Sequence, residues 1–291
     1  MAEPREPLDH HGPGEPLDPV TGRRAGEWAA VVAGLAPVDG PWPPTGPIVV
    51  VAPHPDDELL AAGATLAAAS DAGTEIRVVA VTDGELSHPH LTGSARDDLV
   101  GRRLAETDRA YAAAGIVASR HRLALPDGAA SNHADWLVEQ LTPLLDGAGW
   151  CLAPWEGDGH PDHDVCGRVA GDACRDLAVP FARFPIWSWN WDDPSSPSIP
   201  FDGAVAWSFD DDLRARKQAG IAAYASQVRP VDGHRPILPA GFLEHFARNS
   251  EVFLPVARWT GDRTMLASSG QAPYVSRVSR PRAADRDPGD R

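Results

Sequence analysis

Two short segments rich in histidine and aspartate contain the residue types that could do chemistry in this chain. The first is His54-Pro-Asp-Asp-Glu58, and the second is Gly159-His-Pro-Asp-His-Asp164. Imidazole nitrogens and carboxylate oxygens bind divalent metals, and the same groups serve as general acids and bases. Each segment holds a His-Pro-Asp step beside a further ligand-type residue. Together they predict a metal-dependent catalytic site.

A purely structural interpretation competes with this one for each segment. Asp56, Asp57 and Glu58 would also suit a helix N-terminus, where they cap free amides and complement the dipole. The second segment would also suit a solvated loop in which His163 merely begins a helix. The recurrence of His-Pro-Asp after two separate strands favours the catalytic interpretation of both.

The elements that must position these segments follow from the hydrophobic pattern. The run 48–52 is continuously apolar, which is typical of a parallel strand buried on both faces. Further strands are predicted at 75–81, 121–125, 150–154 and 179–186, and helices at 26–35, 59–72, 94–114, 134–145 and 163–177. This alternation predicts an α/β fold with a Rossmann-like, doubly wound and mostly parallel sheet flanked by helices. Ligands bind beyond the carboxyl ends of the strands in such sheets, which is where both segments fall.

The chain divides into three parts by composition. Residues 1–46 hold nine prolines and form an irregular N-terminal extension with one short helix. Residues 47–267 form the working domain. Residues 268–291 are rich in Arg, Ser, Pro and Asp, have little to bury, and are predicted to be disordered.

Charge and cysteine content exclude several classes of partner. The chain has 26 basic and 41 acidic residues, for a net charge of −15, which disfavours nucleic acids and anionic membranes. The longest apolar runs fall far short of the roughly 18 residues of a membrane span, and no secretory signal is visible. The three cysteines do not form a Cys-x-x-Cys pair, so we expect a cytoplasmic protein. Nothing in the sequence indicates an oligomeric state.

The two segments resemble the motifs of the zinc-dependent N-acetylglucosaminyl deacetylase superfamily, the LmbE-like or PIG-L-like proteins. Pro53-His-Pro-Asp-Asp-Glu58 matches the (P/A)HPDDE motif, and His160-Pro-Asp-His163 matches the HPDH motif about a hundred residues later. Weaker similarities to the family patterns T-x-G-E, R-x-x-E, L-x-D-G and H-x-S-Q lie at 82–85, 103–106, 125–128 and 224–227. The resemblance covers about residues 47–256.

This resemblance implies a set of catalytic roles. One zinc ion per chain would be bound by His54, Asp57 and His163, although a His₂Asp set accepts other divalent metals. Asp56 would be the general base that takes a proton from the attacking water. His160 would stabilise the oxyanion and could protonate the leaving amine. Asp162 would orient a histidine.

Two further residues are implied as substrate contacts, Arg103 and Asp127. A guanidinium and a carboxylate at a pocket rim suit the vicinal hydroxyls of a sugar. Arg103 could instead form an ordinary ion pair with Glu106 on the same helix face. Asp127 could instead be a turn-forming residue before Gly128.

The chain departs from the family pattern at two positions. Asp158 stands where some members have a tyrosine that stabilises the oxyanion. Tyr224 stands where the H-x-S-Q pattern has its histidine. A substrate therefore does not transfer directly from those members to this chain.

Trp187, Trp189 and Trp191 alternate in one segment, so an extended backbone would put all three rings on one side. They could form an aromatic wall for a sugar face or a hydrophobic aglycone. Alternatively, they could pack on the core as a lid or an edge.

The function expected from these features is metal-dependent removal of an acetyl group from an N-acetylated amino sugar or its conjugate, a small-molecule substrate. One alternative is an amidase on thiol-sugar conjugates, which would use the same metal site. Another is a non-catalytic carbohydrate-binding protein on the same fold, which would have no need of Asp56 and three ligands. A dinucleotide-binding oxidoreductase is disfavoured, because His54-Pro-Asp occupies the turn where G-x-G-x-x-G would follow the first strand.

Overall fold

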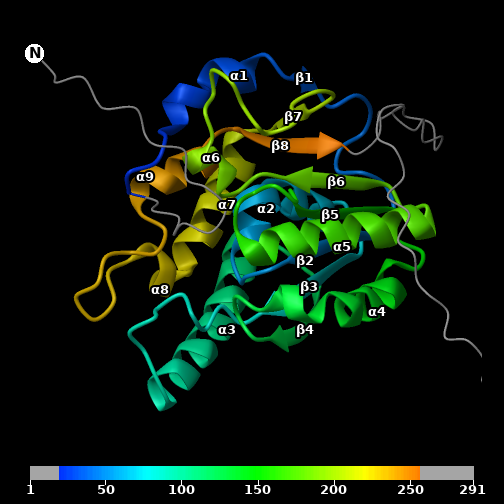
Figure 1. The fold of residues 1–291 in the computed structure, drawn as a ribbon. Coiled ribbons are helices and arrows are strands. Elements are labelled where there is room, and N and C mark those ends of the chain that lie inside the picture. The colour runs from blue at the N-terminus through cyan, green and yellow to red at the C-terminus, as the bar shows by residue number, and fades with distance from the viewer. Residues whose placement is uncertain (1–19, 256–291) are drawn as a thin grey trace, which may run out of the picture.

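Eight strands form one mixed sheet in the computed structural model, which describes residues 20–255 (Figure 1). Their order across the sheet is β1-β7-β8-β6-β5-β2-β3-β4. Neighbouring strands are parallel, except that β8 runs antiparallel to β6 and β7. The strands are β1 (Ala36–Pro37), β2 (Ile48–Ala52), β3 (Ile76–Thr82), β4 (Ser119–Leu125), β5 (Trp150–Pro154), β6 (Phe181–Phe184), β7 (Val205–Ser208) and β8 (Ser250–Pro255).

The five parallel strands β2 to β6 make the sheet doubly wound, as predicted. The chain passes from β2 outward to β3 and β4, and then returns to the other side of β2 with β5 and β6. β2 pairs directly with β5, with Ile48 opposite Trp150. The winding therefore reverses between β2 and β5. Ligand sites of doubly wound sheets lie at this switch point, beyond the carboxyl ends of the strands.

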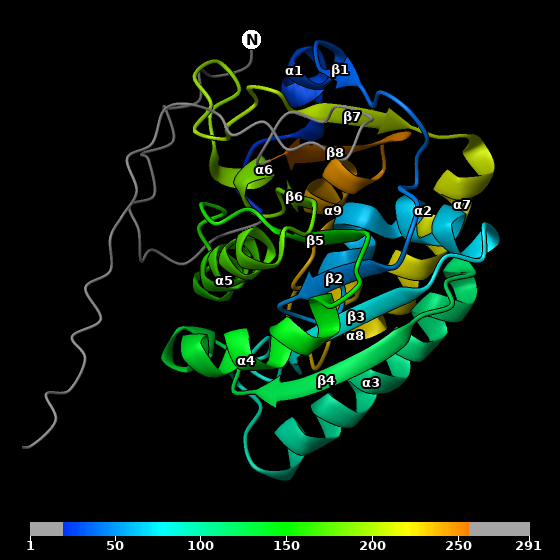
Figure 2. The same ribbon diagram turned by 90° about the vertical axis from the view of Figure 1, so that its right-hand side faces the viewer.

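Helices cover both faces of the sheet (Figure 2). The helices α4 (Ala134–Leu145) and α5 (Pro161–Leu177) lie on one face, and α2 (Asp57–Asp71), α3 (Ser94–Ala114) and α7 (Asp211–Ala223) lie on the other. The strand β2 shows why its sequence is continuously apolar. Val49 and Val51 pack with the first group of helices, whereas Ile48 and Val50 pack with the second. All four side chains are fully buried.

Shorter helical segments fill the connections: η1 (Ala25–Trp28), α1 (Ala29–Ala33), η2 (Ala130–His133), α6 (Ser188–Trp191), α8 (Ala225–Val228), α9 (Ala240–Leu243) and η3 (Glu244–Phe246). The bounds of α3, α4 and β5 agree with the predicted ranges 94–114, 134–145 and 150–154. Between residues 20 and 255, no helix has the length and apolar character needed to cross a membrane.

The N-terminal segment packs onto the sheet from η1 onward. The predicted helix 26–35 is divided into η1 and α1, and β1 then pairs with β7. Trp28 is fully buried, and its indole N–H donates to the carbonyl oxygen of Trp189 at 2.8 Å. The domain boundary at residue 46 stays a prediction, and the predicted tail at 268–291 lies outside the described residues.

A buried ion pair joins α7, β8 and α2. Lys217 Nζ donates to Glu251 Oε1 at 2.8 Å, and both side chains are almost completely buried. The same carboxylate accepts the backbone N–H groups of Ala64 and Thr65 at 2.8 and 2.9 Å. These amides follow a kink in α2 at Ala62, where the backbone is not helical. The Glu251 carboxylate therefore accepts hydrogen bonds both from the amides at the kink of α2 and from the charged Lys217.

Candidate active site

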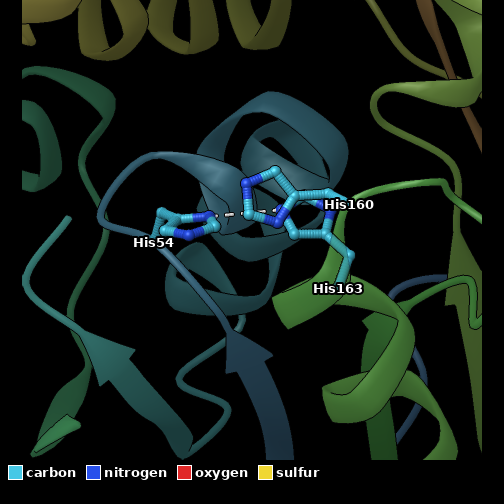
Figure 3. Close-up of side chains that lie close together, drawn as sticks. All are labelled: His54, His160 and His163. Carbon is cyan, nitrogen blue, oxygen red and sulfur yellow. Dashed lines mark hydrogen bonds between the residues drawn. The ribbon is translucent and has the colours of Figure 1, made fainter. Parts of the chain in front are cut away.

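The two His-Pro-Asp segments meet at the switch point of the sheet. His54 lies in the loop between β2 and α2, and His160 and His163 lie at the start of α5, just after β5. Figure 3 shows the ring of His54 facing those of His160 and His163. The ring centroid of His54 lies 4.6 Å from that of His160 and 5.3 Å from that of His163. The pairing of β2 with β5 thus brings together residues from distant parts of the chain.

Three donor atoms of the predicted ligands form a small triangle. His54 Nδ1 lies 3.2 Å from His163 Nε2 and 3.3 Å from Asp57 Oδ2, and His163 Nε2 lies 3.2 Å from the same oxygen. Atoms about 2.1 Å from a tetrahedral zinc ion stand roughly 3.4 Å apart. The triangle therefore fits three protein ligands of one tetrahedral ion.

Each histidine of the triangle has its other ring nitrogen beside a buried carboxylate. His163 Nδ1 lies 2.8 Å from Asp158 Oδ2. His54 Nε2 lies 3.2 Å from Asp127 Oδ1 and 3.3 Å from Asp162 Oδ2. If these outer nitrogens carry the ring protons, both inner nitrogens present lone pairs. This is the usual arrangement around metal-binding histidines.

The electrostatics of the triangle favour positive charge. Burial disfavours the charged form of His163, but Asp57 and Asp158 outweigh it and raise the pKa of His163 to about 9. The pKa of His54 is likewise raised, because the three neighbouring carboxylates outweigh burial. Burial alone would raise the pKa of Asp57, yet the two imidazoles hold it well below its usual range. A divalent cation would take the place of these protons.

Two other groups of three side chains come close enough to hold an ion within residues 20–255. They are His54–His160–His163 and His54–Asp127–Asp162. In the first, His160 Nδ1 already accepts the backbone N–H of Asp162 at 3.3 Å. In the second, Asp127 and Asp162 already accept backbone N–H groups of the adjacent loops. We favour the triangle with Asp57, because its edges are short and its outer nitrogens are paired.

The predicted base, Asp56, lies next to the triangle in an unusual backbone conformation. Its φ is 151° and its ψ is −27°, a strained combination for a residue with a side chain. Hydrogen bonds from α2 stabilise this conformation, because the carbonyl oxygen of Asp56 accepts the N–H groups of Leu59 and Leu60 at 3.0 and 2.8 Å. Burial raises the pKa of the Asp56 carboxyl to about 7, although the Arg103 guanidinium opposes the shift. A pKa near neutrality suits a general base.

Arg103 contacts Asp56 and the loop backbone. Its Nη2 donates to Asp56 Oδ2 at 3.1 Å and to the carbonyl oxygen of Pro55 at 2.9 Å, and its Nη1 donates to that of Gly84. Gly84 has a φ of 66°, and a Cβ there would lie 1.8 Å from Nη1. The alternative partner Glu106 instead accepts the backbone N–H and the hydroxyl of Ser226. Arg103 is 2% exposed, so the structure places it beneath Asp56.

The carboxylate of Asp127 bridges His54 and the loop after β3. Its Oδ1 faces His54, and its Oδ2 accepts the N–H of Leu86 at 2.9 Å. Asp127 also lies before Gly128 in a turn, as the alternative proposes, because the N–H of Ala129 donates to the carbonyl oxygen of Pro126. Burial would raise the pKa of Asp127, but its bond to His54 lowers it to about 2. It is therefore ionised at neutral pH.

Asp162 and His160 lie on either side of the second segment. Asp162 is fully buried, accepts the N–H groups of Gly128 and Ala130 at 2.8 and 3.1 Å, and approaches His54. Burial, together with the nearby His54 and His163, lowers the pKa of His160 to about 3. His160 is therefore neutral near pH 7. Since its Nδ1 accepts a hydrogen bond, its proton lies on Nε2.

A cavity of about 250 Å³ opens over these groups. His54, Asp56, Asp57, Arg103, Asp127 and His160 line it, together with apolar side chains of three loops. Trp187 lines the cavity, but the prediction of an extended segment with three aligned tryptophans is wrong. Residues 188–191 form the short helix α6, so Trp189 turns into the core, and the indole of Trp191 donates to the carbonyl oxygen of Asp158.

The sequence patterns assigned no role to two residues of the site, Asp158 and Gln227. Asp158 was notable only as a departure from the family, and no spacing rule connects its carboxylate with His163. Gln227 lines the cavity, and its side chain donates to Ser226 Oγ at 2.9 Å. Its place in the weak 224–227 similarity was the one signal that could have found it. Tyr224 of the same segment is buried in the core.

Comparison with known proteins identifies deacetylases that are similar to this chain. Residues 49–174 match the family model described as PIG-L: GlcNAc-PI de-N-acetylase. A curated 1D-myo-inositol 2-acetamido-2-deoxy-alpha-D-glucopyranoside deacetylase 1 from Catenulispora acidiphila is 30% identical over 53% of this chain and 57% of that protein. The corresponding deacetylase from Mycolicibacterium gilvum is 26% identical over 72% of this chain and 87% of that protein. The chain thus spans little more than half of the first relative.

Solved structures show the same fold. The A40926 pseudoaglycone deacetylase superposes with a TM-score of 0.56 at 22% identity, over 74% of this chain and 98% of that one. The N,N'-diacetylchitobiose deacetylase from Pyrococcus horikoshii superposes with a TM-score of 0.50 at 21% identity, over 64% and 72%.

The fold and the site together define a doubly wound α/β protein with a candidate mononuclear metal centre at its switch point. Over residues 49–174 the chain is similar to the PIG-L family, the family that its two His-Pro-Asp motifs resemble.

Proposed function

We propose that this chain is a metal-dependent N-deacetylase, which releases acetate from an N-acetylated amino sugar or a conjugate of one. The observation that carries the proposal is the triangle of His54, Asp57 and His163 beside the strained Asp56, with His54, Asp56 and Asp57 lining a cavity. The curated relatives are named as deacetylases of an acetamido sugar linked to inositol, which supports the same substrate class.

The residues fit zinc as the resident metal. A divalent ion held by the triangle would polarise the amide carbonyl and lower the pKa of a water molecule beside it. Two imidazoles and one carboxylate are a frequent set of three protein ligands in catalytic zinc sites. The same donors accept other divalent ions. The three cysteines are buried and unpaired, which fits the proposed cytoplasmic location.

Asp56 moves the proton in this proposal. It accepts a proton from the attacking water as the water oxygen bonds to the carbonyl carbon. When the C–N bond breaks, Asp56 returns that proton to the leaving nitrogen, which leaves as the free amine. The second proton of the water stays on the acetic acid, which then ionises to acetate. His160 is neutral, and its Nε2–H is free to donate to the developing charge on the carbonyl oxygen. Asp162 fixes this tautomer through its backbone N–H.

The two predicted substrate residues separate into different roles. The oxygens of Asp127 line the cavity and retain lone pairs that can accept sugar hydroxyls. Arg103 binds Asp56 and two loop carbonyls, so we propose that it positions the base.

Metal analysis combined with acetate release tests the proposal. We expect about one divalent ion per chain, acetate release from N-acetylglucosamine conjugates, loss of turnover with a chelator, and recovery with zinc. Turnover that survives complete removal of the metal would contradict it. Release of an acid larger than acetate from a thiol-sugar conjugate would favour the amidase alternative instead.

A further inference from the structure

A second cavity lies between α1 and the edge of the sheet that β1, β7 and β8 form (Figure 1). This edge cavity has a volume of about 420 Å³, which is larger than the active-site cavity and within the usual range for small-molecule sites. Within residues 20–255, the two cavities have no lining residue in common. The edge cavity therefore stands apart from the metal triangle and from Asp56.

Most of the edge cavity is lined by aliphatic side chains from η1 to β1 and from β7, which include Ala25, Ala29, Val32, Leu35, Pro37 and Ala206. Ala25, Ala29 and Val32 are spaced by four and three residues, so the consecutive segments η1 and α1 place them on one side. In the described part of the chain, no aromatic ring lines this wall. Such a wall suits a flexible alkyl chain, which gains by leaving water.

Three polar side chains line the same cavity, those of Ser208, Arg248 and Ser250. Ser208 lies directly opposite Ser250 in the antiparallel pairing of β7 with β8, so both side chains project from the same face of the sheet. Arg248 lies two residues before Ser250, in the turn that leads into β8. A guanidinium and two hydroxyls are hydrogen-bond donors that together suit a carboxylate.

The guanidinium of Arg248 lacks an anionic partner. Burial lowers the pKa of Arg248 to about 10, and no carboxylate of the described chain offsets that shift. Its Nη2 lies 3.3 Å from His245 Nδ1, and its Cζ lies 4.5 Å from the centre of the Trp189 ring. Glu251, which lines a small cavity together with Arg248, is already bound to Lys217. An anion in the edge cavity would therefore offset the cost of burying the Arg248 charge.

We propose that the edge cavity binds the anion of a medium-chain alkyl carboxylic acid. The carboxylate pairs with Arg248 and accepts hydrogen bonds from the hydroxyls of Ser208 and Ser250, while the alkyl chain lies along the aliphatic wall. The site is separate from the proposed deacetylation, so either proposal can fail without the other.

Calorimetric titration of the metal-loaded full chain with octanoate, butanoate and octan-1-ol, each below its aggregation concentration, tests the proposal. Octanoate should bind on the order of 100-fold more tightly than butanoate, because four more methylenes leave water. Octan-1-ol has no charge to pair with Arg248 and should bind about 10- to 100-fold more weakly than octanoate.

Two variants of the cavity and one control locate the binding. Arg248→Met should weaken octanoate binding by about 10- to 100-fold and leave octan-1-ol binding nearly unchanged, because only the charge pair is lost. Ala29→Trp should fill the cavity and weaken both ligands without touching Arg248. Arg175→Met removes an exposed guanidinium that pairs with Asp172 and should change neither affinity. Thermal unfolding checks that the variants are folded, and Ala29→Trp decides the matter if Arg248→Met does not fold.

The absence of octanoate binding, or octanoate binding that survives both cavity variants, would overturn the site. Equal affinities for octanoate and octan-1-ol would overturn the pairing with Arg248. A carboxylate could also bind the metal centre, and Asp57→Ala separates the two places. Binding in the edge cavity should survive Asp57→Ala, whereas octanoate binding that is lost in that variant belongs to the metal centre and would contradict the proposal.

Discussion

The carboxylate of Asp158 binds both the ring of His163 and the backbone of the segment that follows β6. Its Oδ2 lies 2.8 Å from His163 Nδ1 and accepts the N–H of Trp187, while its Oδ1 accepts the N–H groups of Ile186 and Ser188 and the Ser188 hydroxyl. One buried side chain therefore fixes the orientation of a predicted metal ligand and part of the cavity wall.

Asp158→Asn should weaken metal binding by about 10- to 100-fold, because the amide oxygen is a poorer partner for His163 than a carboxylate. Competition with a chromogenic chelator measures the affinity. Glu156→Gln is the matched control, since Glu156 is two residues away and pairs with Arg183 outside the site. An unchanged affinity in Asp158→Asn would show that the His163–Asp158 contact does not support metal binding.

Asp57→Ala and His163→Ala should each lose the metal and with it the turnover, because each removes one of three ligands. Metal content after dialysis is the direct measurement. His121→Ala, on strand β4 and away from the site, should keep both the metal and the turnover. A folded Asp57→Ala protein with a full complement of metal would remove Asp57 from the ligand set and favour one of the groups that contain His54 without Asp57.

Arg103→Met should lower kcat with a smaller effect on KM, because it removes the guanidinium that contacts Asp56 and two carbonyls. The pH profile should change as well. Arg103 lowers the pKa of Asp56, so its loss should raise that pKa above about 7 and move the acidic limb of kcat/KM to higher pH. A raised KM with an unmoved acidic limb would instead support direct contact between Arg103 and the sugar.

Glu251→Gln should destabilise the fold by roughly 3–5 kcal/mol, because the substitution leaves the charge of Lys217 buried without a counter-ion. Urea unfolding monitored by tryptophan fluorescence gives the free energy. Asp172→Asn, which breaks an exposed pair with Arg175, should cost less than about 1 kcal/mol. Similar losses for the two variants would mean that the buried pair contributes no more than a surface pair.

The sequence was sufficient to predict the half of the sheet that contains the site. The strand β2 has the continuous apolar run of a strand covered on both faces, and α3 ends at Gly115, which adopts a left-handed conformation with a φ of 70°. Because β2 and β5 are parallel neighbours, their following loops had to meet. That local reasoning placed His54 and His163 together.

The remaining features depend on contacts between distant parts of the chain. The strand β8 pairs antiparallel with β6 and β7, and the short strand β7 has no pattern that distinguishes it from a loop. The tryptophans of residues 187–191 alternate as in a strand, but four backbone and side-chain bonds to Asp158 fold the start of that segment into a turn. No rule on sequence spacing anticipates a partner 28 or more residues away.

The activity and metal content of Asp56→Asn test most directly whether Asp56 is the general base. An amide of the same shape cannot accept a proton from water, yet it should leave the His54–Asp57 turn in place. We predict full metal content, unimpaired substrate binding, and a loss on the order of 10²–10⁴ in kcat. Loss of the metal would show that Asp56 is a ligand. Full activity with the metal retained would contradict its role as the base.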